Sequence, residues 1–240
     1  MSAKKLKIDS KLLRQYSSKR KKRTPKIIKY RILIVCEGIK TEPNYFRSIE
    51  KKHGAAMVYE LTVQGEGANT VQVVDKAIEL RDKATPKYDS VWAVFDKDSF
   101  SSNAFNSAIR KAESNGIGCA WSNEAFELWY LYHFHNRVTA MSRTEYKKCI
   151  SDAVNQSELY KEKRPYQYEK NATDTLEVLQ KYGSQDNAIR WAEVQSQTFT
   201  DTRYANHNPC TMVYKLVRQL IGEDEEFNRL VKEKIESGKE

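Results

Sequence analysis

Acidic residues stand at the ends of two predicted buried strands. Glu37 directly follows the apolar run "ILIVC", and Asp96 and Asp98 close the run "SVWAVFDKD" at 90–98. Residues i and i+2 of an extended chain point to the same side, so we expect Asp96 and Asp98 to face one point. If the two strands are neighbours in a parallel sheet, Glu37 approaches that point from the adjacent strand.

Three carboxylates in one pocket repel one another, so either some of them are protonated or a cation binds them. Mg²⁺ and Mn²⁺ prefer oxygen ligands, and Mg²⁺ usually keeps several of its waters when it binds a substrate phosphate. Such a centre supports hydrolysis of phosphodiester bonds. Gly38, next to Glu37, lets the chain turn sharply and lets a phosphate approach the backbone. A D-x-D pair alone also caps turns and helices, but its combination with Glu-Gly after another strand is more specific.

The elements that must position these acids alternate between strand and helix. Strands are predicted at 30–36, 56–65, 90–98 and 117–121, and helices at 41–54, 69–84, 103–116 and 124–134. This order predicts an α/β fold, Rossmann-like, with a mostly parallel sheet flanked by helices. Sites in such sheets form beyond the carboxyl ends of the strands, where the acids stand.

Charge divides the chain unevenly. Of the 41 basic and 32 acidic residues, 13 basic and one acidic residue lie in 1–31, which leaves 28 basic and 31 acidic residues in 32–240. We interpret 1–26 as a basic, disordered arm, 27–136 as the α/β core, and 137–240 as a mainly helical extension packed on it. An arm of this charge binds phosphate backbones through counterion release.

Several classes of protein are disfavoured by what the sequence lacks. The four cysteines form no C-x-x-C pair and have no zinc-ligand spacing. No apolar run is long enough to cross a membrane, and the basic N-terminus has no apolar signal-peptide core. We therefore expect a reduced, cytoplasmic protein. The segment "QGEGAN" at 64–69 lacks the Lys-Ser/Thr of a nucleotide-binding P-loop, so it is interpreted as a turn.

Four motifs carry a resemblance to a known family. They are "VCEGIKTEPNYF" at 35–46, "VFDKDSF" at 94–100, "SNEAFELWYLYHF" at 122–134 and "NPCTMVYKLV" at 208–217. A glutamate after the first strand and D-x-D after the third resemble the signature of the Toprim domain, found in topoisomerases, primases and the overcoming-lysogenization-defect nucleases. The match is closer to the RloB-like group of Toprim proteins, which is linked to restriction and phage-defence loci. The chain departs from that group at Glu124, where a proline is expected.

The resemblance implies that Glu37, Asp96 and Asp98 hold Mg²⁺ or Mn²⁺ and act in catalysis, with Glu37 as a ligand or as a general acid or base. It implies a metal-dependent endonuclease that hydrolyses DNA or RNA in phage defence, with a separately encoded ATPase as a partner. The alternative is a non-catalytic Toprim scaffold that binds nucleic acid or the ATPase. A strand-rejoining enzyme is disfavoured, because no partner domain for a nucleophilic tyrosine is recognisable.

Further residues are candidates for the same site. Glu127, an acid in an apolar helix, either faces the acidic pocket as a ligand or base or lies on the wet face of its helix. Substrate phosphates are expected to meet basic or helix-terminal residues. These are Lys40, Lys170, Asn208, Arg20, Lys21, Lys22 and Arg23.

Other polar and aromatic residues near the motifs are interpreted structurally. Glu42 lies in the first turn of a helix, where it suits the helix dipole. His133 and the neighbouring Trp129, Tyr130 and Tyr132 are expected to belong to the core rather than to a metal site or a base-stacking platform.

Overall fold

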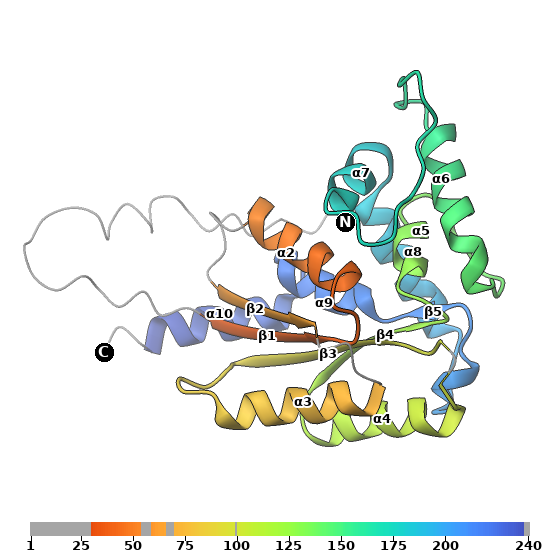
Figure 1. Ribbon diagram of the computed structural model, residues 1–240. Helices are drawn as coiled ribbons and strands as arrows, with labels where there is room; N and C mark the ends of the chain where they lie inside the picture. The colour runs from red at the N-terminus through yellow and green to blue at the C-terminus, as the bar shows by residue number, and fades with distance from the viewer. Residues whose placement is uncertain (1–29, 54–58, 66–69, 99, 238–240) are drawn as a thin grey trace, which may run out of the picture.

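The computed structural model describes residues 30–53, 59–65, 70–98 and 100–237, and its centre is a five-stranded sheet (Figure 1). The strand order is β2-β1-β3-β4-β5. The first four strands are parallel, and β5 is antiparallel to β4. The strands are β1 (Tyr30–Cys36), β2 (Tyr59–Gly65), β3 (Ser90–Asp96), β4 (Gly118–Asn123) and β5 (Cys210–Thr211). The predicted α/β fold with a mostly parallel sheet is confirmed.

Alternation along the buried strands builds two separate cores. In β1, Ile32 and Ile34 pack into the core on one face of the sheet, whereas Leu33 and Val35 pack into the core on the other. All four side chains are buried. A strand covered on both faces reads as a continuous apolar run, which is why this segment shows no polar alternation.

Helices cover both faces of the sheet. Figure 1 shows α3 (Thr70–Lys83) and α4 (Ser102–Ser114) on one face. The opposite face carries α2 (Thr41–His53), α5 (Glu127–Leu131) and α9 (Val213–Ile221). The connection from β1 through α2 returns to β2 beside it, and β3 then pairs on the other side of β1. The carboxyl ends of β1 and β3 therefore lie next to each other, which is the condition under which Glu37 and Asp96 are expected to meet.

The C-terminal part is mainly helical and also completes the sheet. Its remaining helices are α6 (Tyr146–Gln156), α7 (Thr175–Tyr182), α8 (Gln185–Gln197) and α10 (Glu225–Ser237), with short 3-10 turns at Arg143–Glu145 and Tyr204–Asn206. Helix α9 ends at Gly222, which has a φ of 78° that a glycine adopts without strain. None of the helices in these ranges is long and apolar enough to cross a membrane.

Strand β3 and helix α5 are shorter than predicted. β3 ends at Asp96, not at 98, because its pairing with β4 stops at Asp96 and Ser122. Asp98 then adopts a φ of 35°, in the left-handed region. α5 covers only Glu127–Leu131 of the predicted 124–134.

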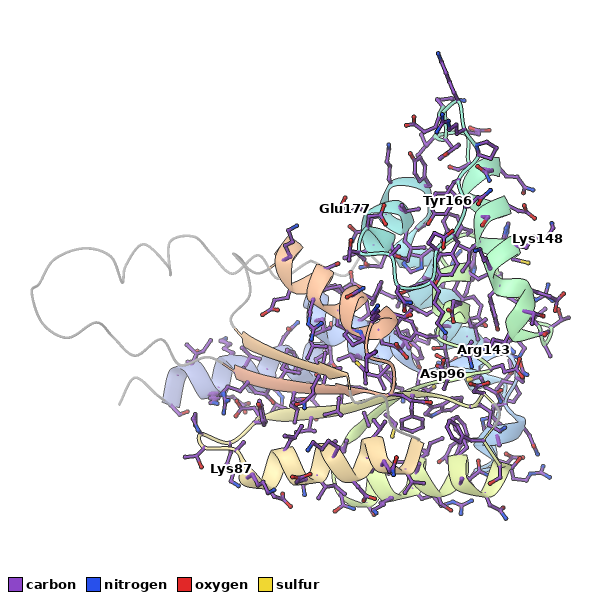
Figure 2. The ribbon with its side chains drawn as sticks, viewed as in Figure 1. Lys87, Asp96, Arg143, Lys148, Tyr166 and Glu177 are labelled. Carbon is purple, nitrogen blue, oxygen red and sulfur yellow. The ribbon has the colours of Figure 1, made fainter. Side chains whose placement is uncertain are left out.

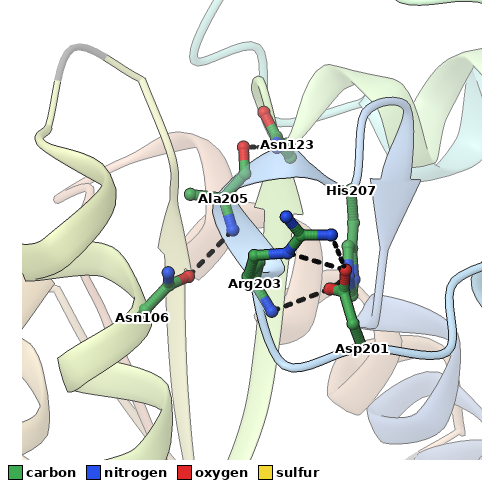
Figure 3. Close-up of polar contacts among 6 residues, drawn as sticks. All are labelled: Asn106, Asn123, Asp201, Arg203, Ala205 and His207. Atoms are coloured by element: carbon green, nitrogen blue, oxygen red, sulfur yellow. Dashed lines mark hydrogen bonds and ion pairs between the residues drawn. The ribbon is translucent and has the colours of Figure 1, made fainter.

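Strand β5 lies within the motif "NPCTMVYKLV" at 208–217, which begins with the candidate residue Asn208. Figure 3 shows the polar contacts that hold the segment before it. The Asn123 side-chain amide donates to the Ala205 carbonyl at 2.9 Å, and the Asn106 side chain accepts from the Ala205 N–H at 2.9 Å. Asp201 pairs with His207 Nε2 at 2.9 Å. These contacts anchor the segment at the end of β4, where β5 pairs.

Candidate functional site

A pocket of about 440 Å³ opens at the carboxyl edge of the sheet, beyond β1 and β3. Figure 2 shows Asp96 and Arg143 together at this edge. The lining comes from the loop after β1, from α2, from the end of β3 and the residues after it, from the start of α5, from the 3-10 turn at Arg143–Glu145, and from the loop before α7. The lining residues are Glu37, Gly38, Ile39, Lys40, Thr41, Glu42, Asp96, Asp98, Phe126, Glu127, Arg143, Lys170 and Asn171.

Glu37 and Asp96 are brought into direct contact by the pairing of β1 with β3. The Glu37 backbone N–H donates to the Val94 carbonyl at 2.8 Å, which continues the β1–β3 ladder by one residue. Glu37 Oε2 then accepts a hydrogen bond from the Asp96 backbone N–H at 3.1 Å. Asp96 Oδ2 accepts from the Phe126 N–H at 3.0 Å, at the start of α5. Two predicted site residues therefore meet where the sequence places them.

Asp98 lines the same pocket but is turned to a different partner. Asp96 and Asp98 both line the pocket, as expected, but not through strand alternation, because the strand ends between them. The backbone N–H of Asp98 donates to the Glu124 carbonyl at 3.1 Å. Its carboxylate forms an ion pair with the guanidinium of Arg143. Arg143 is a pocket residue that sequence reasoning missed, and no motif in the sequence marks it.

Two more acids face the pocket from the helices. Glu127 begins α5, is only 6% exposed and lines the pocket, so of the two interpretations of this residue the structure shows the pocket-facing one. Glu42, in the first turn of α2, is also only 6% exposed and lines the pocket. The structural interpretation of Glu42 therefore missed a pocket residue. A Cβ added at Gly38 would lie 2.2 Å from Glu42 Oε2, so Gly38 makes room for this carboxyl group.

Burial raises the pKa values of the acids at the base of the pocket. Desolvation raises the pKa of Glu37 from 4.5 to about 7, with smaller contributions from the charges of Glu42 and Asp98. Desolvation is also the main cause of the raised pKa of Glu42. The pKa of Asp96 lies well above its usual range, because of desolvation first and then because of Glu42 and Glu127. A cation at this position would reverse these shifts, since it favours the charged carboxylates.

The loop between α6 and α7 forms one wall of the pocket. Tyr168 is buried and donates a hydrogen bond to Glu127 Oε1 at 3.3 Å. Lys170 Nζ lies 4.0 Å from the same oxygen. Asn171 is bonded to α2, since Thr41 Oγ1 donates to Asn171 Oδ1 at 3.0 Å and the Asn44 amide donates to the Asn171 carbonyl at 3.0 Å. The loop therefore fixes a lysine beside the acidic cluster.

The donor atoms of the pocket are of the type that Mg²⁺ and Mn²⁺ select, although they do not form a complete cage. Asp96 Oδ1 is buried and makes no hydrogen bond among the described residues, so one carboxylate oxygen of the pocket is left without a protein partner. Among the described residues, no three His, Cys, Asp or Glu side chains are arranged so that they could together coordinate a metal ion. Asp98, the third predicted ligand, is paired with Arg143 instead. The residues fit a hard divalent cation in chemistry and burial, with one ligand engaged elsewhere.

The remaining candidates are placed differently. Lys40 is exposed at the pocket mouth. Asn208 does not line the pocket, and its Oδ1 is buried without a hydrogen bond from any described residue. His133 is buried and bonds the Trp129 carbonyl at 3.0 Å, so it belongs to the core, as do Trp129 and its aromatic neighbours. The four arm residues at 20–23, like the whole predicted arm, lie outside the described residues.

Comparison with protein families gives one match. The model of a family described as RloB-like protein matches residues 32–220. The matched range contains every residue that lines the pocket. Neither the search of curated proteins nor the search of solved structures gives a match.

Proposed function

This chain belongs to the RloB-like family, and we propose that it is a Mg²⁺- or Mn²⁺-dependent nuclease of the Toprim type that hydrolyses phosphodiester bonds in DNA or RNA. One observation carries the proposal. Glu37 and Asp96 touch each other through a backbone hydrogen bond at the floor of the pocket, and Asp96 Oδ1 is buried there without a partner in the described chain. Buried acids with raised pKa values that share a pocket are typical of catalytic and metal-binding sites.

Glu37, Asp96 and Asp98 would hold the cation, with Glu42 and Glu127 close enough to support it. When bound, a divalent cation supplies charge stabilisation for the phosphoryl oxygens and lowers the pKa of a water. Glu37 has a second capacity of its own, because a carboxyl group with a pKa of about 7 can accept or donate a proton near neutral pH.

Basic residues around the pocket suit an anionic, extended substrate. Lys40 and Lys170 line the pocket at its solvent side, and Lys170 is 51% exposed. Beyond them, the α6–α7 loop carries Lys161, Lys163 and Arg164 at its exposed end, and none of these three makes an ion pair with a described residue. Cations of this kind bind phosphates without reading sequence. The substrate class we propose is therefore a nucleic acid strand that crosses the pocket mouth.

The role in phage defence and an ATPase partner encoded separately remain parts of the proposal that rest on the family resemblance. The test of the reaction itself is direct. Purified protein is incubated with transfer RNA, plasmid DNA and single-stranded DNA, each with Mn²⁺, with Mg²⁺ or with EDTA, and the products are mapped. We expect cleavage of at least one substrate with the metal and none with EDTA. Cleavage that persists in EDTA would contradict a metal-dependent nuclease.

One observation favours the second candidate, a non-catalytic module that binds nucleic acid or a protein partner. Asp98 is neutralised by Arg143, which leaves no complete metal-holding group in the described ranges. Calorimetry with Mg²⁺ and Mn²⁺ separates the two candidates. A scaffold gives no binding heat, whereas a nuclease binds at least one metal ion and loses it on substitution of Glu37 or Asp96.

A further inference from the structure

Arg143 forms an ion pair with Asp98, one of the carboxylates expected to bind the proposed metal ion. The Arg143 guanidinium is paired with Asp98 at the pocket wall, and each side chain is about one third exposed, at 36% and 35%. Both residues line the pocket. Arginine stays charged at all working pH values and its guanidinium is weakly hydrated, so it suits a partly buried carboxylate better than lysine does.

The ion pair is held from both sides by one residue. The Glu124 carbonyl accepts the Asp98 backbone N–H at 3.1 Å, and Glu124 Oε2 accepts the Arg143 backbone N–H at 2.9 Å. The turn that carries Arg143 is itself capped, since the Ser142 N–H donates to Glu145 Oε2 at 2.9 Å. The backbone positions of both partners are therefore fixed, while the two side chains keep access to solvent.

Carboxyl groups outnumber basic side chains in the lining of the pocket. Five carboxyl groups line it, from Glu37, Glu42, Asp96, Asp98 and Glu127, against three basic side chains, from Lys40, Arg143 and Lys170. Of these three, Arg143 forms the contact with Asp98, and Lys170 lies against Glu127. A divalent cation bound by Glu37 and Asp96 would compete with the like-charged guanidinium for Asp98, which the Arg143 guanidinium contacts at Oδ2.

We propose that Arg143 is a displaceable counter-cation, which neutralises Asp98 in the metal-free protein and is exchanged for the divalent cation when the pocket is loaded. Arg143 is then a positioning residue that sets how tightly the metal binds. This inference rests on the proposed function, because it requires that the pocket binds a metal ion.

The test is a calorimetric titration of the full chain with Mn²⁺, without substrate. An exposed or partly exposed ion pair contributes up to about 1 kcal/mol, so we expect Arg143→Gln to bind Mn²⁺ up to about fivefold more tightly than the wild type. Arg143→Lys, which keeps the charge but loses the planar fork, is expected to give an intermediate affinity. The effect should depend on Asp98: in an Asp98→Asn background, Arg143→Gln should leave the weakened affinity unchanged.

Lys148→Gln is the matched control, because it removes one positive charge from the neighbouring helix α6, where Lys148 pairs with Asp152 at the surface. It should leave the affinity for Mn²⁺ unchanged. An unchanged or weaker affinity in Arg143→Gln overturns the inference, and so does an equal tightening in the Asp98→Asn background, which would be a general charge effect. If neither the wild type nor Arg143→Gln binds Mn²⁺, both the inference about Arg143 and the proposed metal-dependent function are overturned. Binding by the wild type with no change in the variant overturns the inference alone.

Discussion

At the scale of single residues, ionisation of the buried acid Glu37 lowers the stability of the folded protein. Glu37 ionises with a pKa of about 7 in the fold against an ordinary value of 4.5, so the folded protein favours its neutral form. This contribution to stability is complete below pH 4.5 and is lost as the pH rises through about 7. A cluster of acids that lowers the stability of a protein is expected at a functional site, where the acids are kept for their function and not for their contribution to the fold.

Glu37→Gln should therefore stabilise the metal-free protein at high pH. In EDTA at pH 8 we expect its free energy of unfolding to exceed that of the wild type by about 1 to 2 kcal/mol, after allowance for solvent screening at this half-buried site. The difference should vanish near pH 4, where both side chains are neutral. Thermal unfolding across this pH range measures it. If the wild type is as stable as the variant at pH 8 in EDTA, ionisation of Glu37 does not destabilise the fold, which would contradict this prediction.

At the scale of elements, the strands and the carboxyl-edge acids could be predicted because local signals and sheet geometry agree. Four apolar runs separated by helices place Glu37 and Asp96 at strand ends, and the structure shows that the two strands are neighbours. The partner of Asp98 could not be predicted, since Arg143 comes from a short turn distant in sequence and nothing in its own neighbourhood marks it. The position of Glu42 in the first turn of a helix indicates only a structural role, because it gives no information about the space that Gly38 leaves beside the Glu42 carboxyl group. Tertiary contacts decided both cases.

The α6–α7 loop is the element whose anchoring is most open to test. Asn171 has a φ of 75° and accepts the Thr41 hydroxyl, so its residue type satisfies both the backbone and the contact with α2. Asn171→Ala should lower the free energy of unfolding by about 2 kcal/mol, from the lost hydrogen bond and a left-handed residue with a Cβ. Asn171→Gly, which loses only the hydrogen bond, should cost less. Chemical denaturation of both variants checks the order, and equal costs would contradict the role of the left-handed backbone.

At the scale of the whole molecule, charge separates the acidic pocket from a basic projection. The end of the α6–α7 loop stands out from the body above α6 and α7 (Figure 1). It is held in shape by the Tyr160 hydroxyl, which donates to the Arg164 carbonyl at 2.8 Å, and by Asn155, which bonds both the N–H and the carbonyl of Tyr166. The same loop enters the pocket at Lys170. A strand bound by the projection would thus be led toward the acids.

Removing the charge of the projection should weaken binding of nucleic acid in a salt-dependent way. The triple variant Lys161→Gln, Lys163→Gln, Arg164→Gln should lower affinity for a labelled strand in fluorescence anisotropy. The slope of log affinity against log salt should become shallower by about 2 to 3 for a duplex if all three cations meet phosphates. The control carries the same charge change on the α3–α4 side of the sheet: Lys83→Gln, Lys87→Gln, Arg110→Gln (Lys87 is labelled in Figure 2). An equal loss in both triples would show that only net charge matters.

The central claim, that the acids at the sheet edge cleave phosphodiester bonds with a divalent cation, is tested most directly at Asp96. Cleavage with Mn²⁺ is measured for the wild type, for Asp96→Asn, and for Asp75→Asn, which alters an exposed acid paired with Lys111 on the other face of the sheet. We expect the cleavage rate of Asp96→Asn to be at least about 100-fold lower than that of the wild type, with an unfolding temperature that is unchanged or higher. Asp75→Asn should cleave at the wild-type rate. Cleavage by folded Asp96→Asn at the wild-type rate would contradict the claim.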